Sequence, residues 1–111
     1  MDQLNKVLNS SQEVRDELNR KFKDFDYDDF LENCFRANGK SFNYTGSDVK
    51  EHLVNGMKSM INAYFGVRPG IFISAVIDNN LVGAVENADH INRNFLFVYC
   101  SFKYNYLPIT S

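Results

Sequence analysis

The first third of the chain repeats apolar side chains at the three- and four-residue spacing that an α-helix requires. This stripe consists of Leu4, Val7, Leu8, Val14, Leu18 and Phe22. Ser10 and Glu13 lie in the middle of the stripe and have the form of a capping box, in which each side chain satisfies a backbone amide of the other residue. The stripe therefore predicts either one long helix or two shorter helices that meet near Ser10.

A second helical pattern begins at Asp26, which is a typical N-cap residue. Asp28 and Asp29 follow in the first turn, where carboxylates favour the positive end of the helix dipole. Apolar side chains then recur at positions i, i+3, i+4, i+7 and i+8, namely Tyr27, Phe30, Leu31, Cys34 and Phe35. Asn38-Gly39 supplies a left-handed stop. We expect a helix between Asp26 and Asn38.

Residues 41–45 alternate polar and aromatic side chains, which predicts a short edge strand or an extended connector. Ser47 then caps a long predicted helix from Asp48 to about Phe65. Its buried face consists of Val49, Leu53, Met57, Met60, Ile61 and Tyr64. Gly66 and the Pro69-Gly70 pair end this helix and indicate a tight turn.

After Gly70 the apolar residues alternate, which is typical of β-strands. The pattern predicts a three-stranded antiparallel meander with strands at Ile71–Ile77, Leu81 to about Asn87 and Phe95 to about Tyr104. Asp78-Asn79-Asn80 forms its hairpin loop. Because the helices precede the strands, we expect an α+β fold in which three to four N-terminal helices pack on the sheet. Residues 1–111 then form a single domain.

Length and composition favour a folded domain with a real core. The chain has 111 residues, 44% of them hydrophobic and 23% charged, and only two prolines, which excludes a disordered tail. No secretory leader or apolar run approaching the roughly 20 residues of a membrane helix is visible. We therefore expect a cytoplasmic protein that does not enter membranes and whose cysteines, Cys34 and Cys100, are reduced. Its asparagine-rich composition is typical of AT-rich coding, which many phages and some bacteria share, and is compatible with a phage or mobile-element origin.

The formal net charge is −2, so no global positive field attracts nucleic acid. Residues 1–33 hold nine acidic and five basic side chains, whereas residues 34–111 hold five and seven. Asp24, Asp26 and Asp28 match the first ligands of a calcium-binding loop. The match ends there, because the sixth position is Asp29 instead of glycine and the twelfth is Phe35 instead of glutamate. We expect no cofactor and no metal ion.

The leading hypothesis is a non-enzymatic protein-binding domain of the inhibitor, immunity or adaptor type, which occludes or docks on a larger protein. In such a complex, acidic side chains would raise the rate of association with a basic partner, and aromatic rings buried at the interface would slow dissociation. The candidate partner-binding residues are Asp24, Asp26, Tyr27, Asp28, Asp29, Phe102, Lys103, Tyr104 and Tyr106. The aromatic end of the third strand has two interpretations: core beneath the N-terminal helices, or an exposed edge that also permits a homo-oligomer.

Two alternative functions come from other classes. A single-stranded nucleic-acid-binding protein would stack bases on the aromatic residues of the third strand, although the acidic balance makes nucleic acid a less favoured partner than protein. This alternative uses Tyr99, Tyr104 and Tyr106 with Lys103, Arg68 and Arg93 as cationic contacts. A small enzyme would use His90 with Asp89 as an oriented base or with Cys100 as a nucleophile. Against it, a cysteine in an apolar strand is usually inert.

Overall fold

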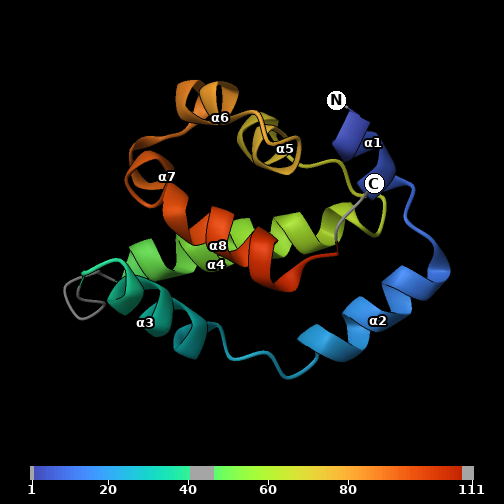
Figure 1. The fold of residues 1–111 in the computed structure, drawn as a ribbon, viewed down its shortest axis with the longest axis horizontal. Coiled ribbons are helices and arrows are strands. Elements are labelled where there is room, and N and C mark those ends of the chain that lie inside the picture. Colours follow the sequence, from blue (N-terminus) through green and yellow to red (C-terminus); the bar gives the residue numbers. More distant parts are fainter. Residues whose placement is uncertain (1, 41–46, 109–111) are drawn as a thin grey trace.

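The structure is a computed structural model that describes residues 2–40 and 47–108, and this part of the chain contains eight α-helices and no strand (Figure 1). The predicted extended segment at residues 41–45 lies outside the described residues. The helices are α1 Asp2–Leu8, α2 Gln12–Phe22, α3 Tyr27–Ala37, α4 Ser47–Ala63, α5 Ile71–Ile77, α6 Leu81–Asn87, α7 His90–Asn94 and α8 Leu96–Tyr106. In the described ranges, none of these helices has the length and apolar character needed to cross a membrane.

The predicted N-terminal helices are confirmed. The first apolar stripe, which predicted either one helix or two, forms the two helices α1 and α2. The break falls at Ser10 and Ser11, and it is Ser11 that caps α2 by accepting a 3.2 Å hydrogen bond from the amide of Val14. Asp26 caps α3 as expected, with its Oδ1 accepting from the amide of Asp29 at 3.0 Å. Gly39, with a φ of 69°, follows the end of this helix in the left-handed conformation that favours glycine.

The predicted β-meander is wrong, and the fold is all-helical. The first two predicted strands are α5 and α6, and most of the third is α8. The strand edge at which we predicted a homo-oligomer therefore does not exist in the described residues. The residues that we predicted to form turns do lie between elements, but they act as N-caps of helices. Gly70 is the N-cap of α5, and the side chain of Asn80 accepts from the amide of Gly83 at 3.0 Å to cap α6.

Burial explains why the sequence pattern of these helices resembled that of strands. In α5 the buried side chains follow a helical instead of an alternating spacing, and they are Phe72, Ile73, Ala75, Val76 and Ile77. In α8 the buried residues are Val98, Tyr99 and Phe102, spaced by one and three. Short apolar runs that are covered on most sides have no clear periodicity, so a buried helix and a buried strand look alike in sequence. Burial from several sides hid the helical period.

The molecule is organised around α4 and α8, which lie along each other at its centre (Figure 1). Helix α3 packs on α8 from one side, and α5 packs on both central helices from the other. The two central helices approach closely at Gly56, where an added Cβ would lie 2.5 Å from the ring of Tyr99. The largest fully buried side chains are Tyr99, Phe35, Phe102, Leu4, Leu18, Leu31 and Leu53. This core fixes the positions of α5, α6 and α8, between which the candidate site lies.

Candidate functional site

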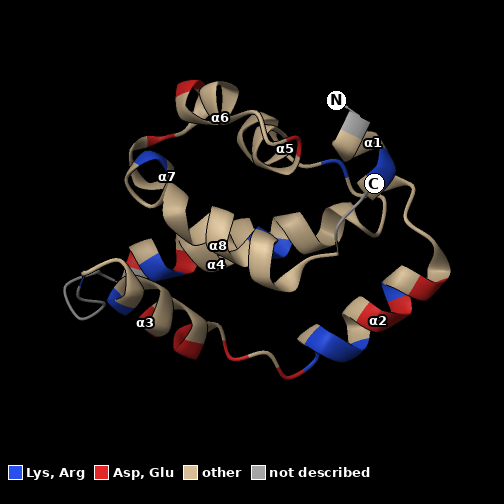
Figure 2. Ribbon diagram, viewed as in Figure 1, with Lys and Arg blue, Asp and Glu red and all other residues tan. Residues whose placement is uncertain are grey.

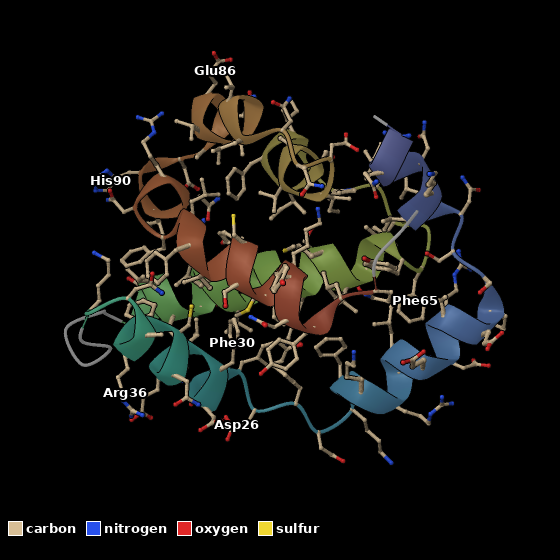
Figure 3. All side chains as sticks on the ribbon, viewed as in Figure 1. Asp26, Phe30, Arg36, Phe65, Glu86 and His90 are labelled. Atoms are coloured by element: carbon tan, nitrogen blue, oxygen red, sulfur yellow. The ribbon has the colours of Figure 1, made fainter. Side chains whose placement is uncertain are left out.

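The predicted acidic residues surround the start of α3, and three of them have partners within the chain. Asp26 is the N-cap described above (Figure 3). Asp28 forms a 2.8 Å ion pair with Lys50 of α4, and Asp29 accepts a 3.3 Å hydrogen bond from the side chain of Asn33. Asp24 is exposed in the connection that precedes the helix. The acidic stretch thus caps α3 and links it to α4.

The aromatic side chains that we predicted to share a surface with these acids point into the molecule. Phe25 is the centre of an aromatic cluster, with its ring centroid 4.9 Å from Tyr27, 5.1 Å from Tyr106 and 5.9 Å from Phe102. Phe102 is fully buried, and Tyr27 and Tyr106 are half-buried. These contacts hold α3 against α8. For Phe102 the core interpretation is the one that the structure supports.

Lys103 and Tyr104 complete the predicted set, and both line a cavity that does not include the acidic stretch. Tyr104 is 86% exposed. The structure therefore does not bring the nine predicted residues together on one surface. Tyr99, which the nucleic-acid alternative required as an open stacking platform, is fully buried.

The residues of the enzymatic alternative are not assembled either. Asp89 caps α7 by accepting from the amide of Asn92 at 2.7 Å, and its other carboxylate oxygen lies 3.0 Å from Nε2 of His52. His90 points away from the body of the protein, where its Nε2 lies 3.4 Å from the side-chain amide of Asn94 (Figure 3). Cys100 lines the cavity, which neither histidine does. Among the side chains that the structure describes, no group of three or more His, Cys, Asp or Glu residues is arranged to hold a metal ion.

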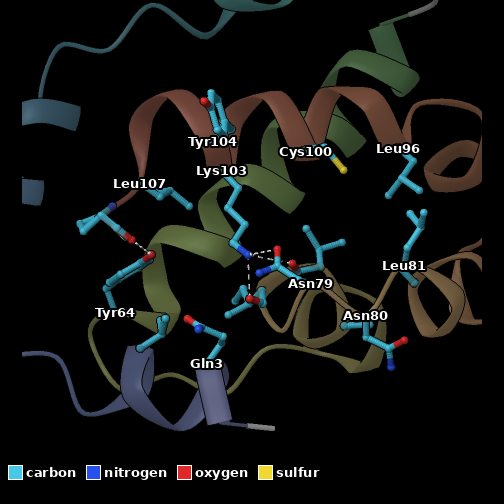
Figure 4. A pocket seen from close by; sticks show the side chains of 16 residues that line it. Gln3, Tyr64, Asn79, Asn80, Leu81, Leu96, Cys100, Lys103, Tyr104 and Leu107 are labelled. Atoms are coloured by element: carbon cyan, nitrogen blue, oxygen red, sulfur yellow. Dashed lines mark hydrogen bonds between the residues drawn. The ribbon is translucent and has the colours of Figure 1, made fainter. Parts of the chain in front are cut away.

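The candidate site is a cavity of about 450 Å³ between α5, α6 and α8, with α1 at one end (Figure 4). This volume lies within the range of roughly 300–1,000 Å³ that is usual for small-molecule sites. Its wall is mainly apolar, and the principal apolar side chains are Val7, Val76, Ile77, Leu81, Leu96 and Leu107. A cavity of this kind is suited to an apolar ligand or an apolar side chain of a partner.

Lys103 crosses this cavity from α8 to α5 (Figure 4). Its Nζ donates hydrogen bonds to the carbonyl of Ile77 at 2.8 Å, the carbonyl of Val76 at 3.3 Å and Oδ1 of Asn79 at 2.6 Å. The carbonyls belong to the last residues of α5, so the ammonium lies at the negative end of that helix dipole. Burial lowers the pKa of Lys103, while nearby Cys100 and Asp78 raise it. The ammonium thus lies beside a mostly apolar wall.

The turn between α5 and α6 anchors the wall of the cavity at two points. Asp78 accepts a 2.7 Å hydrogen bond from the amide of Leu4, near the start of α1. Asn79, the next residue, has a φ of 59° and receives the bond from Lys103. The turn thereby joins α1 and α8, which are far apart in the sequence. This link is long-range, so no local sequence signal indicates it.

Cys100 contributes a thiol to the cavity wall one turn before Lys103. Cys100 as a residue is exposed, but partial burial of its thiol raises the pKa, and the neighbouring ammonium of Lys103 opposes that effect only in part. Burial likewise raises the pKa of Cys34. Thiols with raised pKa values are weak nucleophiles at neutral pH, because little thiolate is present. Both cysteines are therefore poor candidates for catalysis.

A second feature adjoins the cavity. Leu81, Val82 and Val85 form an exposed apolar strip along α6, which we call the α6 face, with exposed fractions of 60%, 68% and 39%. The inward side of this helix carries only small side chains, since Ala84 is its buried residue. The strip is visible in the sequence at spacing i, i+1 and i+4, but our assignment of these residues to a strand concealed it.

The α6 face lies in a stretch of the chain that carries few charges. Residues 71–88 contain only two charged side chains, Asp78 and Glu86. Figure 2 shows that the charges instead concentrate on α2, α3 and the connection between them. Leu81 lines the cavity as well as the face, so the two features are continuous. No family model matches this chain, and neither a curated protein nor a solved structure matches it.

Proposed function

We propose that this chain is a non-enzymatic protein-binding domain and that its α6 face docks on an amphipathic helix of a larger protein. The observation that carries this proposal is the exposure of Leu81, Val82 and Val85 side by side on one helix. Contiguous exposed apolar patches on soluble domains mark interaction sites more often than isolated apolar residues do. The proposed binding surface is therefore on α6 and not on the acidic stretch.

The position of α6 supports a helix as the occupant. This helix packs mainly on α5 and lies at the edge of the bundle, so its outer side has room for another helix (Figure 1). Side chains at i, i+1 and i+4 form a ridge of the kind that packs into the groove of a neighbouring helix. Because the surrounding residues carry little charge, the matching side of the partner helix should be apolar and uncharged.

The energy available from this face is modest. Full burial of a Val or Leu side chain contributes about 1.5–3 kcal/mol. The three side chains are already about half covered, so completing their burial supplies roughly 2–5 kcal/mol. Association has a large entropic cost, which makes this amount insufficient alone. We therefore expect the partner also to contact Ile71 and Tyr104, which are 71% and 86% exposed.

The test begins with affinity capture from a cell lysate on the wild-type chain and on Val82→Asp, followed by identification and purification of the protein that only the wild type retains. Isothermal titration calorimetry then measures the dissociation constant for that purified protein. We expect Val82→Asp to weaken binding at least about tenfold, because it places a charge in an apolar contact. Glu17→Gln, an exposed position on α2 and away from α6, should bind within about twofold of wild type.

Three results would contradict the proposal. The first is a purified partner that binds Val82→Asp as tightly as wild type. The second is the absence of any protein whose retention depends on Val82. The third is a wild-type dimer in size-exclusion chromatography with light scattering that Val82→Asp dissociates, since the occupant of the α6 face would then be a second copy of the chain. Circular dichroism verifies that both variants are folded.

A further inference from the structure

Among the described residues, the positive charge in the cavity between α5, α6 and α8 donates its hydrogen bonds to neutral oxygens. The three acceptors of the Lys103 ammonium are two backbone carbonyls and the side-chain amide of Asn79. Buried or half-buried charges are usually paired with an opposite charge, because a charge removed from water is costly. The carboxylate of Asp78 is close enough to offset part of this charge, although the hydrogen bond that its Oδ1 accepts comes from the amide of Leu4 and not from Lys103. The cavity thus offers an anion a partly unneutralised cation.

The volume of the cavity sets the size of a ligand. A cavity of about 150 Å³ holds one benzene molecule. By proportion, about 450 Å³ accommodates roughly 18 non-hydrogen atoms. The apolar wall requires most of these atoms to be hydrocarbon. A single interior cation, Lys103, is best matched by a single negative charge.

We infer that this cavity binds a singly anionic, mostly apolar molecule of the fatty-acid class, with its carboxylate at Lys103 and its hydrocarbon chain between Leu81 and Leu96. The inference does not rest on the proposed docking function, because the ligand's charge is matched by Lys103 of α8. Leu81 and Tyr104 do belong both to the cavity wall and to the surface expected to contact a partner. It concerns a free amphiphile rather than a membrane surface.

The two ends of the cavity differ, which fixes the direction of the chain. Figure 4 shows Leu81 and Leu96 facing each other at one end, with the sulfur of Cys100 close by, and Gln3 and Tyr64 at the other end. The end with Leu81 and Leu96 is the more apolar, so it suits the hydrocarbon chain. Lys103 reaches between the two ends, where a carboxylate can contact its ammonium.

The carboxylate gains its contact by replacing Asn79. Of the three acceptors of Lys103, the two carbonyls belong to α5 and are fixed by that helix, whereas the Asn79 amide is an exposed side chain on a turn. Hydrogen bonds between an ammonium and a carboxylate are stronger than those between an ammonium and a neutral amide. A bound carboxylate therefore displaces the Asn79 side chain while the helix cap remains.

The experiment uses dodecanoate, below its micelle concentration, and the neutral dodecanol as its matched control. Isothermal titration calorimetry measures binding, and native-state alkylation of Cys100 by N-ethylmaleimide, followed by mass spectrometry, reports whether the cavity is filled. Cys34 is an internal control because it is buried away from this cavity. We expect dodecanoate to slow alkylation of Cys100 at least about fivefold and to bind at least about tenfold more tightly than dodecanol.

Lys103→Met keeps the length of the side chain but removes the ammonium, so it should lose the preference for dodecanoate over dodecanol. Lys58→Met, on α4 and away from the cavity, should retain it. The comparison of acid and alcohol on the wild-type protein remains decisive if Lys103→Met does not fold. Dodecanoate that leaves the Cys100 alkylation rate unchanged, or that binds no better than dodecanol, overturns the inference. Val82→Asp should bind dodecanoate as wild type does, which separates this result from the docking test.

Discussion

The ammonium of Lys103 on α8 donates a 2.8 Å hydrogen bond to the backbone carbonyl of Ile77, the last residue of α5. This contact joins two residues that are 26 positions apart in the sequence, and it caps the C-terminal end of α5. It also holds the turn from which α6 begins. The position of the α6 face and the shape of the cavity therefore both depend on it.

Replacing Lys103 should destabilise the protein. Lys103→Met removes the charged group that caps α5 but keeps an apolar side chain of similar length. Because hydrogen bonds to charged groups stabilise a folded protein more than neutral ones do, we expect the free energy of unfolding to fall by about 1–2 kcal/mol. Urea denaturation followed by circular dichroism measures this value. Lys58→Met is the control, because the ammonium of Lys58 lies over the ring of Tyr27 at the surface and should contribute only about 0.5 kcal/mol. Equal losses in the two variants would contradict a capping role for Lys103.

Gly56 should be required for the close packing of α4 on α8. Gly56→Ala places a methyl group against the ring of Tyr99, and overpacking of this kind costs about 1–3 kcal/mol. This loss should exceed the gain in helix propensity from alanine, which is about 1 kcal/mol. In a double-mutant cycle with Tyr99→Leu, the two effects should be strongly non-additive, because the second change removes the obstructing ring. Additive losses would contradict this prediction, because they would show that the cost of the alanine does not come from the ring of Tyr99.

Replacing Asp26 should destabilise the protein much more than replacing Asp24, although the two residues lie only two positions apart. Asp26→Ala removes the N-cap of α3, which costs about 1 kcal/mol. Asp24→Ala changes an exposed residue before the helix and should stay within about 0.5 kcal/mol of wild type. Thermal and urea unfolding of both variants measure the difference. The cap assignment fails if the two substitutions have the same effect.

The stability of the protein should fall in alkaline solution through Tyr64. Burial raises the pKa of this hydroxyl from 10.0 to about 12. Between pH 10 and 12 the unfolded chain releases this proton while the folded chain keeps it, so the stabilisation is complete below pH 10 and is lost as the pH rises towards 12. Tyr64→Phe, which cannot ionise, should lose about 1–2 kcal/mol less than wild type over this interval. Parallel pH profiles for the two proteins would contradict this prediction.

The sequence predicted boundaries better than it predicted the type of element. Asp26 and Gly39 mark the ends of α3 as expected, and Gly70 and Asn80 begin elements at the predicted positions. The segments that follow were assigned to strands because residues 71–77 are rich in β-branched and aromatic side chains, which favour strands when no clear period is present. Packing against the central helices outweighs that local preference.

The candidate site was beyond the reach of sequence patterns for a different reason. Lys103 was singled out as a partner contact, but its acceptors lie 24 to 27 residues away and become neighbours only when α8 crosses α5. The α6 face follows from the sequence only once residues 81–87 are known to be helical. The aromatic rings predicted beside the acidic stretch face inward because α8 supplies Phe102 and Tyr106 to the same cluster.

Both proposals depend on residues 71–88 forming two helices and not a hairpin of strands. Nuclear magnetic resonance of the isotope-labelled protein tests this most directly through the Cα chemical shifts and the amide contacts of this segment. We predict helical Cα shifts for Ile71–Ile77 and Leu81–Asn87, together with short-range contacts between residues three positions apart. We predict no cross-strand amide contacts between Val76 and Val82. Extended shifts with cross-strand contacts between those two valines would contradict the account.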